Sequence, residues 1–373
     1  RSSDRAEIRS ELADVLGRLK DARIVDPLLE LLKDPEWRVR WKVLKSFERM
    51  ARDGPLPQHA RAALFDYAHG ELAEFRHSLE CTRALFPTAT THAEHMLALA
   101  LEEDRHNIQE RVFRMLGVLC GRQAMQEIFE ELQSNDPRLR ADALEALDTL
   151  APKAVGRELL ALLEPVPTSG PSATPPVAPL LDSLATHSKP WVRACTSLYL
   201  GHHDHPNRAA MLTTLLNDRA PLVRETSLWS GWTALGDSWR AHLDEASRST
   251  DNHLRETARK IIARGTNGAS APRLSPRKGE PMLLSIEKAV FLKSAPLFAA
   301  LEGEELAALA DIALEVAYQP GEVIFEENQE PHHLYLVVEG KVEVFRRVNS
   351  HERALAHLGE KECFGEMAIL DEQ

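Results

Sequence analysis

The chain has 373 residues, of which 43% are hydrophobic and 27% charged, and its formal net charge is −12. This length is enough for two or three domains with cores of their own. The acidic balance argues against general electrostatic binding to nucleic acid. No apolar run is long enough to cross a bilayer.

The four cysteines lie far apart and form no CxxC pair; they are Cys81, Cys120, Cys195 and Cys363. This usage predicts free thiols in a reducing, cytoplasmic setting, without a disulfide framework or a structural zinc site. Leucine and alanine are abundant while aromatic residues make up only 6%, which favours helix over most of the length.

An apolar residue followed by arginine recurs along the first two thirds of the chain at intervals of 31, 36, 64, 53, 31 and 31 residues. The gap of 64 fits two repeats with a midpoint at Ile108-Gln109, and the gap of 53 fits one repeat plus a proline-rich insertion. The pairs are Ile8-Arg9, Val39-Arg40, Phe75-Arg76, Leu139-Arg140, Val192-Arg193, Val223-Arg224 and Leu254-Arg255. Such self-similarity is typical of repeat proteins, in which each unit buries the face that it could not bury alone.

A turn that ends in proline precedes several of these pairs, as at Asp34-Pro35, Asp136-Pro137, Lys189-Pro190 and Ala220-Pro221. Proline is tolerated in the first turn of a helix, and an aspartate before it can cap the free amides there. After the turn, apolar residues return at helical spacing. The pattern predicts pairs of antiparallel helices stacked into an α-solenoid.

The run DARIVDPLLELLKDPEWRVRWKVLKSF resembles a HEAT repeat, and the likeness extends over roughly residues 4–264. In such solenoids we expect the repeated arginines to bond inside the molecule rather than to bind an anion. A buried charge needs a partner, so we expect these arginines to pair with carboxylates such as Asp34 or Asp218.

Two segments rich in proline, glycine and serine interrupt the helical pattern. We therefore predict HEAT-like repeats at 1–163 and 180–264, a Pro-rich loop at 164–179 and a flexible linker at 265–282. The remaining residues, 283–373, form the last predicted domain. There we expect helix over 285–316 and then short strands at 322–325, 334–339, 341–347 and 354–358. Glycine turns between them indicate a small antiparallel barrel or jelly roll.

The order of motifs in this last domain resembles a cyclic nucleotide-binding domain. The segments that carry the resemblance are a PGEVIF strand, a LYLVVEGKVEVF hairpin and a cassette that opens FGEMA. The resemblance implies a β jelly roll, truncated here, behind an N-terminal helical segment. It also implies that cAMP or cGMP is the ligand and that no cofactor is needed.

The resemblance assigns the binding residues to the cassette Phe364, Gly365, Glu366, Met367 and Ala368. Glu366 would accept a hydrogen bond from the ribose 2′-hydroxyl, and the amides of Gly365 and Ala368 would face the cyclic phosphate. The family's phosphate-pairing arginine does not follow before Gln373, so we expect the chain as given to bind weakly or not at all. Other departures are Asn328, Pro331 and Lys361, where the family often has glycine.

We therefore expect a regulatory or scaffold protein that responds to a cyclic nucleotide and contacts a protein partner through its HEAT surface. No catalytic constellation is present, so we do not expect an enzyme. A degenerate site on a pure scaffold is one alternative. The histidine-rich run Gly201–His205 could suggest a metal, but a loop between helices explains it better.

A second alternative is the cytosolic tail of a membrane transporter. The run that begins LALALEEDRHNIQERVF resembles the helical region after the membrane domain of bacterial ATP/ADP translocase-like nucleotide transporters. The chain begins at Arg1 without a methionine, which fits a piece of a longer protein. Contact with a membrane is then expected only through a domain upstream of residue 1.

Overall fold

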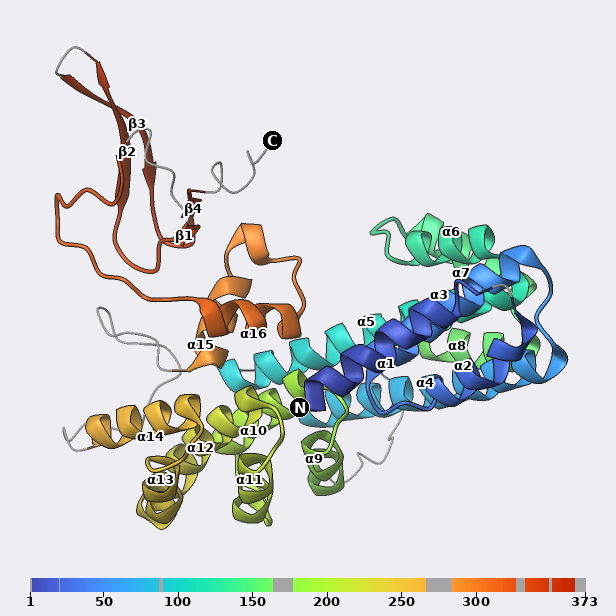
Figure 1. The fold of residues 1–373 in the computed structure, drawn as a ribbon, viewed down its shortest axis with the longest axis horizontal. Coiled ribbons are helices and arrows are strands. Elements are labelled where there is room, and N and C mark those ends of the chain that lie inside the picture. Colours follow the sequence, from blue (N-terminus) through green and yellow to red (C-terminus); the bar gives the residue numbers. More distant parts are fainter. Residues whose placement is uncertain are drawn as a thin grey trace. The chain divides into compact units, whose positions relative to one another are not determined.

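The computed structural model describes residues 2–19, 21–86, 90–163, 177–265, 284–326, 333–348 and 351–365. The chain divides into two compact units. Unit 1 contains Arg1–Thr90 and Ala98–Lys189, and unit 2 contains Thr91–Leu97 and Pro190–Gln373. Most of the described chain is helical (Figure 1), and none of its helices is both long and apolar enough to traverse a membrane.

Unit 1 is built of helices that lie against their neighbours in the sequence. They are α1 (Ser2–Leu16), η1 (Ala22–Ile24), α2 (Val25–Leu31), α3 (Trp37–Asp53), α4 (Gln58–Leu85), most of α5 (His92–Cys120), α6 (Arg122–Leu132), α7 (Pro137–Leu150), α8 (Lys153–Leu163) and α9 (Val177–Ala185). Helix α1 packs on α3, α6 on α7, and α7 on α8. The apolar positions predicted for α3 are fully buried at Val39, Val43 and Phe47, which confirms the helical spacing there.

The repeat start expected at Ile108-Gln109 is wrong. Helix α5, with 29 residues, runs unbroken through this place, and α4 before it is also long, with 28 residues. No proline interrupts either helix, and buried alanine and leucine recur along α4 every four residues from Ala60 to Leu72. Such an unbroken apolar face stabilises one long helix, because nothing in the sequence ends it.

The Pro-rich segment predicted as loop at 164–179 is helical at its end, because α9 begins at Val177. Pro179 therefore lies in the first turn of α9, where its missing N–H costs no hydrogen bond. The other residues of that segment, 164–176, and residues 266–282 of the predicted linker lie outside the described parts. The division into five segments expected from the sequence stays a prediction.

In unit 2, helix α12 packs between α10 on one side and α14 on the other (Figure 1). Its elements are α10 (Pro190–His202), α11 (Arg208–Leu216), α12 (Pro221–Leu235), η2 (Gly236–Trp239), α13 (Arg240–Ala246), α14 (Asn252–Gly265), α15 (Ser285–Lys293), η3 (Pro296–Phe298), α16 (Gly303–Ile312), β1 (Tyr335–Leu336), β2 (Val342–Val348), β3 (His351–Leu358) and β4 (Cys363–Phe364).

Arg9 and Arg193 pair with aspartates as predicted, whereas Arg140 and Arg255 donate to main-chain carbonyl oxygens. Arg9 Nε donates to Asp34 over 2.6 Å in unit 1, and Arg193 Nε donates to Asp218 over 2.7 Å in unit 2. The same two aspartates also close their own turns, since Asp34 accepts from the amide of Glu36 and Asp218 from that of Ala220. Each aspartate thus closes the turn before one helix and holds the arginine of the repeat before it.

The C-terminal part forms two antiparallel strand pairs, β1 with β4 and β2 with β3. The strand predicted at 322–325 is wrong, because these residues have no strand partner among the described residues. The helix predicted over 285–316 is divided around Pro296 into α15, η3 and α16, and it ends at Ile312. Beyond it, Leu314 is 86% exposed, which a helix packed on the core would not leave open.

Candidate functional site

The predicted cassette begins at the short strand β4, which the sequence reading had not identified as a strand. Phe364 in β4 pairs with Tyr335 of β1, and Cys363 pairs with Leu336. Two backbone bonds extend this ladder beyond the strands, from the Val337 amide to the Glu362 carbonyl oxygen (3.0 Å) and from the Lys361 amide to the Val337 carbonyl oxygen (2.8 Å). The start of the cassette is therefore held in place by main-chain hydrogen bonds.

Three aromatic rings hold the same strand pair from its side. Tyr335 and Phe364 stack with centroids 5.0 Å apart, and Phe325 lies 5.9 Å from Tyr335 and 6.0 Å from Phe364. Phe364 is only 9% exposed. Aromatic pairs at these distances stabilise a small core by about 0.5–1.5 kcal/mol each beyond burial. Phe364 thus serves packing in this small core.

Gly365 takes a backbone conformation that other residues adopt rarely, with φ of +86°. A Cβ at this position would stand 2.8 Å from the carbonyl oxygen of His333. Glycine is therefore required here by the turn and by the close approach of the chain. This structural requirement is separate from the role in phosphate binding that the family resemblance assigns to Gly365.

The turn before β4 shows how the chain tolerates one departure from the family pattern. Lys361 has φ of +71°, so a glycine at this place would be unstrained and the lysine is accommodated at some cost. The Gly359 amide donates to the Glu362 carboxylate over 2.5 Å, which closes the turn around Lys361. The other two departures, Asn328 and Pro331, lie outside the described residues.

The structure brings together only part of the predicted site. Phe364 and Gly365 are adjacent at the end of β4, as described above. Glu366, Met367 and Ala368 lie outside the described residues, so their roles at the ribose and phosphate stay predictions. The sequence did not lead us to single out Tyr335 and Phe325. Both are aromatic residues in predicted strands of a chain with few aromatic residues, and this was a usable signal.

Comparison with known families finds one match at each end of the chain. Residues 315–373 match the cyclic nucleotide-binding domain, and residues 1–80 match HEAT repeats. The chain carries HEAT repeats at its N-terminal end and a cyclic nucleotide-binding domain at its C-terminal end. The resemblance to transporter tails stays a prediction.

Two curated relatives illustrate the similarity. A cyclic AMP receptor protein of Thermus thermophilus is 43% identical over 86 residues, which are 22% of this chain and 38% of that protein. A CRP-like cAMP-activated global transcriptional regulator of Mycobacterium tuberculosis is 32% identical over 81 residues, 21% of this chain and 36% of the relative. The chain thus spans less than two fifths of the length of these relatives.

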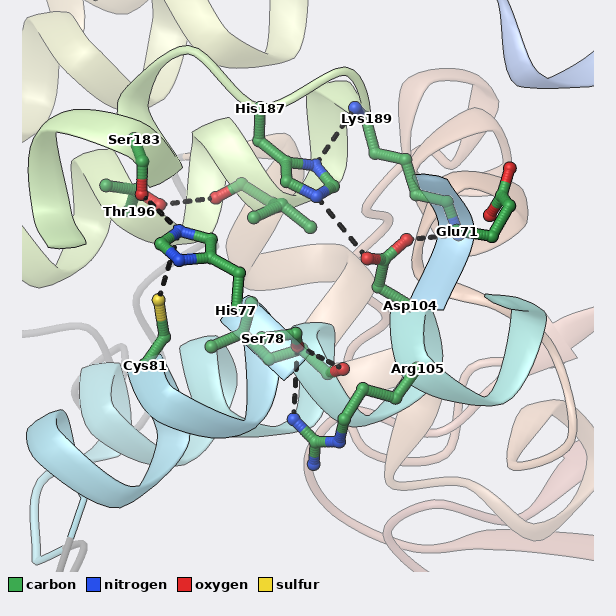
Figure 2. A network of polar contacts seen from close by, with 12 residues as sticks. Glu71, His77, Ser78, Cys81, Asp104, Arg105, Ser183, His187, Lys189 and Thr196 are labelled. Carbon is green, nitrogen blue, oxygen red and sulfur yellow. Dashed lines mark hydrogen bonds and ion pairs between the residues drawn. The ribbon is translucent and has the colours of Figure 1, made fainter. Parts of the chain in front are cut away.

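A second polar cluster lies in unit 1. Asp104 of α5 is 3% exposed and lies between two side chains that follow α9 (Figure 2). Lys189 Nζ is 3.1 Å from its Oδ1, and His187 Nε2 is 3.4 Å from its Oδ2. The Lys189 amide donates to His187 Nδ1, so Nε2 carries the hydrogen that faces Asp104.

The pKa of Asp104 reflects this setting. Burial alone would raise the pKa of the carboxyl, but the hydrogen bond from His187 and the charge of Lys189 hold the pKa well below its usual range. Asp104 is therefore an ionised, structural carboxylate at neutral pH. The sequence carried one signal of this ion pair. Lys189 stands directly before a proline, at the place that an aspartate occupies in the turns of Asp34 and Asp136.

A serine, a histidine and a cysteine meet next to this cluster. His77 Nε2 lies 2.6 Å from Ser183 Oγ and 3.6 Å from Cys81 Sγ (Figure 2). The Ser183 hydroxyl donates to the Leu180 carbonyl oxygen over 2.6 Å, so its hydrogen is directed away from His77. Burial, with the charge of Glu80, raises the pKa of the Cys81 thiol to about 11. Neither group is prepared as a nucleophile.

The histidine-rich run Gly201–His205 ends α10 and enters the turn before α11. His203 stacks on Tyr199 with centroids 3.9 Å apart, and its Nε2 lies 3.1 Å from Glu94. His205 Nδ1 accepts from the Asn207 amide. Across the described ranges, no group of three or more histidine, cysteine, aspartate or glutamate side chains is placed to hold a metal ion.

Proposed function

We propose that this chain is a regulatory protein in which a cyclic nucleotide binds the C-terminal domain and alters how the HEAT repeats meet a protein partner. The observation that carries the proposal is the family match over residues 315–373, together with the two described residues of the cassette. Two similar proteins are described as a cyclic AMP receptor and as a cAMP-activated regulator. On that ground we favour cAMP over cGMP as the ligand.

The geometry of the site supports a binding role. Gly365 leaves the main chain uncovered at the point where the cassette begins, and the β1–β4 ladder fixes its position. A fixed main chain at the start of the cassette is what a preorganised anion site needs. Glu366 supplies the ribose contact in this proposal.

We further propose that the protein is not an enzyme. The Ser183, His77 and Cys81 cluster is the arrangement in the described residues that most resembles a nucleophile with its base, and it lacks an activated nucleophile. The acidic composition agrees with a protein partner rather than nucleic acid. Exposed apolar residues along α1, at Ile8, Leu12 and Val15, give the HEAT repeats a face suited to such a partner.

The test is isothermal titration calorimetry of the full natural protein with cAMP and with cGMP. We expect heat from one site with cAMP, and a Glu366→Ala variant that binds about 10- to 150-fold more weakly. That range corresponds to a charge-assisted hydrogen bond of roughly 1.5–3 kcal/mol.

The matched control is Glu343→Ala, which removes an exposed carboxylate from β2 of the same domain and should leave affinity unchanged. Absence of heat with either nucleotide would favour the alternative, a scaffold whose nucleotide site is silent.

A further inference from the structure

Helix α3 of unit 1 is basic, although the chain as a whole is acidic. Its 17 residues include six lysines or arginines and only two acidic residues, whereas the whole chain has a formal net charge of −12. Two of the six tryptophans, Trp37 and Trp41, lie about one turn apart on this helix, and both are partly exposed. Helix α3 therefore presents aromatic rings and positive charge together.

Each of the two indole rings is contacted by a cation that is already paired inside unit 1. Lys189 Nζ lies 5.4 Å from the centroid of the Trp37 ring, and its charge is balanced by the buried aspartate described above. The guanidinium carbon of Arg114 lies 4.2 Å from the centroid of the Trp41 ring. Arg114 Nη1 also donates to both carboxylate oxygens of Glu48, over 3.0 and 3.1 Å. These contacts hold the two rings in place before a partner binds.

Each ring also has an exposed cation beside it. The guanidinium carbon of Arg38 lies 5.4 Å from the Trp37 centroid, and Lys45 Nζ lies 5.4 Å from the Trp41 centroid. Arg38, Lys45 and Arg52 are exposed and follow one another at intervals of seven residues. Seven residues are about two turns, so the three cations form a row along one side of α3, about 10 Å apart. We call Trp37, Arg38, Trp41, Lys45 and Arg52 the α3 face.

The other cations of α3 are engaged within unit 1. Arg40 donates to two main-chain carbonyl oxygens of the preceding turn. Arg49 pairs with Asp14 over 2.6 Å, and Lys42 lies 3.8 Å from Glu11. The α3 face thus offers three exposed cations, whereas proteins that bind a nucleic-acid backbone tightly make roughly 6–10 phosphate contacts. A short acidic peptide fits this face better than a nucleic acid does.

We propose that the α3 face is a docking surface for a protein partner and that it binds an acidic segment with apolar side chains. The apolar side chains pack against the two indoles, and the carboxylates pair with the row of exposed cations. The inference rests on the proposed function, because it names the class of partner that the HEAT repeats meet. Tryptophan and arginine are enriched among the residues that dominate binding energy, and a ring fixed in advance loses little entropy on binding.

The experiment is a selection of peptides from a random library displayed on phage, with the full natural protein immobilised. We expect the enriched peptides to carry net negative charge and at least one large apolar residue. An enriched peptide labelled with fluorescein then gives the dissociation constant by anisotropy, and its binding should weaken as salt is raised. Enrichment of neutral or basic peptides, or no enrichment, would overturn the proposal.

The first variant is Lys45→Glu, which reverses one exposed charge and leaves the core unchanged. We expect the acidic peptide to bind this variant about threefold to tenfold more weakly, because one attraction is replaced by a repulsion. Arg157→Glu, at an exposed position of α8, is the matched control and should leave the affinity unchanged. An equal loss in both variants would assign the effect to overall charge and contradict the docking surface.

The second variant, Trp37→Ala, tests the rings. We expect it to bind the peptide about 30-fold more weakly or worse, which is the loss typical of a central interface residue. Trp37 is the first residue of α3 and is partly exposed, and Lys189 keeps its aspartate partner in the variant, so we expect it to fold. Circular dichroism and an unchanged affinity for cAMP check this. An affinity within about twofold of wild type would overturn the role of the rings.

The outcomes separate this proposal from the proposed function. Heat with cAMP but no enriched acidic peptide overturns the docking surface alone. An acidic peptide that binds the α3 face with an affinity independent of cAMP supports the docking surface and contradicts the regulation proposed above. A labelled single-stranded DNA oligonucleotide that binds more tightly than the peptide, and that Lys45→Glu weakens, would assign the face to nucleic acid and overturn the proposal.

Discussion

The two units of this chain each bury a carboxylate, and the two carboxylates have opposite surroundings. Asp104 in unit 1 faces Lys189 and His187. Glu225 in unit 2 accepts only neutral donors, and among the described residues no lysine or arginine pairs with it. Burial raises the pKa of Glu225, and the charge of Asp311 acts in the same direction. The pKa of Asp104 is held low despite its burial.

The comparison shows that burial of an acidic group does not fix its charge or its contribution to stability. A paired carboxylate is costly to remove, because its partner is left charged in the interior. An unpaired carboxylate is costly to keep ionised, because desolvation disfavours the charged form. We therefore expect the two positions to respond in opposite directions to neutral substitutions and to pH.

The largest effect is expected for Asp104→Asn. The change leaves the ammonium of Lys189 buried without its anion and should lower the free energy of unfolding by about 3–5 kcal/mol. Chemical denaturation at pH 7 measures this. Since the pKa of Asp104 is depressed on folding, its contribution is present above its ordinary value of 3.8 and is lost as pH falls below it. The loss in the variant should therefore shrink on acidification.

The control for this prediction removes both charges. Asp104→Asn combined with Lys189→Met should lose less than Asp104→Asn alone, because no unpaired charge remains. If the double variant were as unstable as the sum of the two single ones, the pair would not be the cause.

An intermediate effect of opposite sign is expected for Glu225→Gln. The amide can keep both bonds, with its oxygen toward the Ser285 amide and its nitrogen toward the Thr257 hydroxyl, which can accept. Its neutral side chain escapes the cost of ionisation, so stability at pH 8 should rise by roughly 1 kcal/mol. Because folding raises the pKa of Glu225, wild type loses this stability as pH rises above the ordinary value of 4.5.

The gain in Glu225→Gln should therefore vanish near pH 4 and grow toward pH 8. Denaturation series at several pH values can follow it, with Glu256→Gln on the neighbouring α14 as an exposed control. A gain that does not depend on pH would show that ionisation of Glu225 is not its source.

The smallest effect is expected for an exposed carboxylate. Glu30 pairs with Lys33 over 3.0 Å, with both side chains about three quarters exposed at 75% and 74%. Glu30→Ala should change the unfolding free energy by about 0.5 kcal/mol or less, because such pairs are screened by water. A loss near that of Asp104→Asn would mean that pairing, and not burial, decides the difference.

The sequence determined several features because they are local or repeat along the chain. The Val-Arg spacing predicted the solenoid, and Arg9 and Arg193 pair with Asp34 and Asp218 as expected. The glycine turns predicted where strands begin and end, with Gly340 at φ of +98° before β2. The hairpin expected across Gly340 is wrong, because β1 pairs with β4 and β2 pairs with β3. Phe364 and Gly365 were chosen from a family motif, and the structure gives each a physical role in packing or turn formation.

Only the tertiary structure decided the rest, because those features depend on residues far apart in the chain. Asp104 meets Lys189 and Glu225 meets Ser285 across more than 50 residues, and no local pattern marks such a pair. Helix α5 runs through the repeat start expected at Ile108, since burial along a continuous face outweighed the period of the sequence. Gly303 is required only by the indole of Trp191, a constraint that exists once the chain has folded.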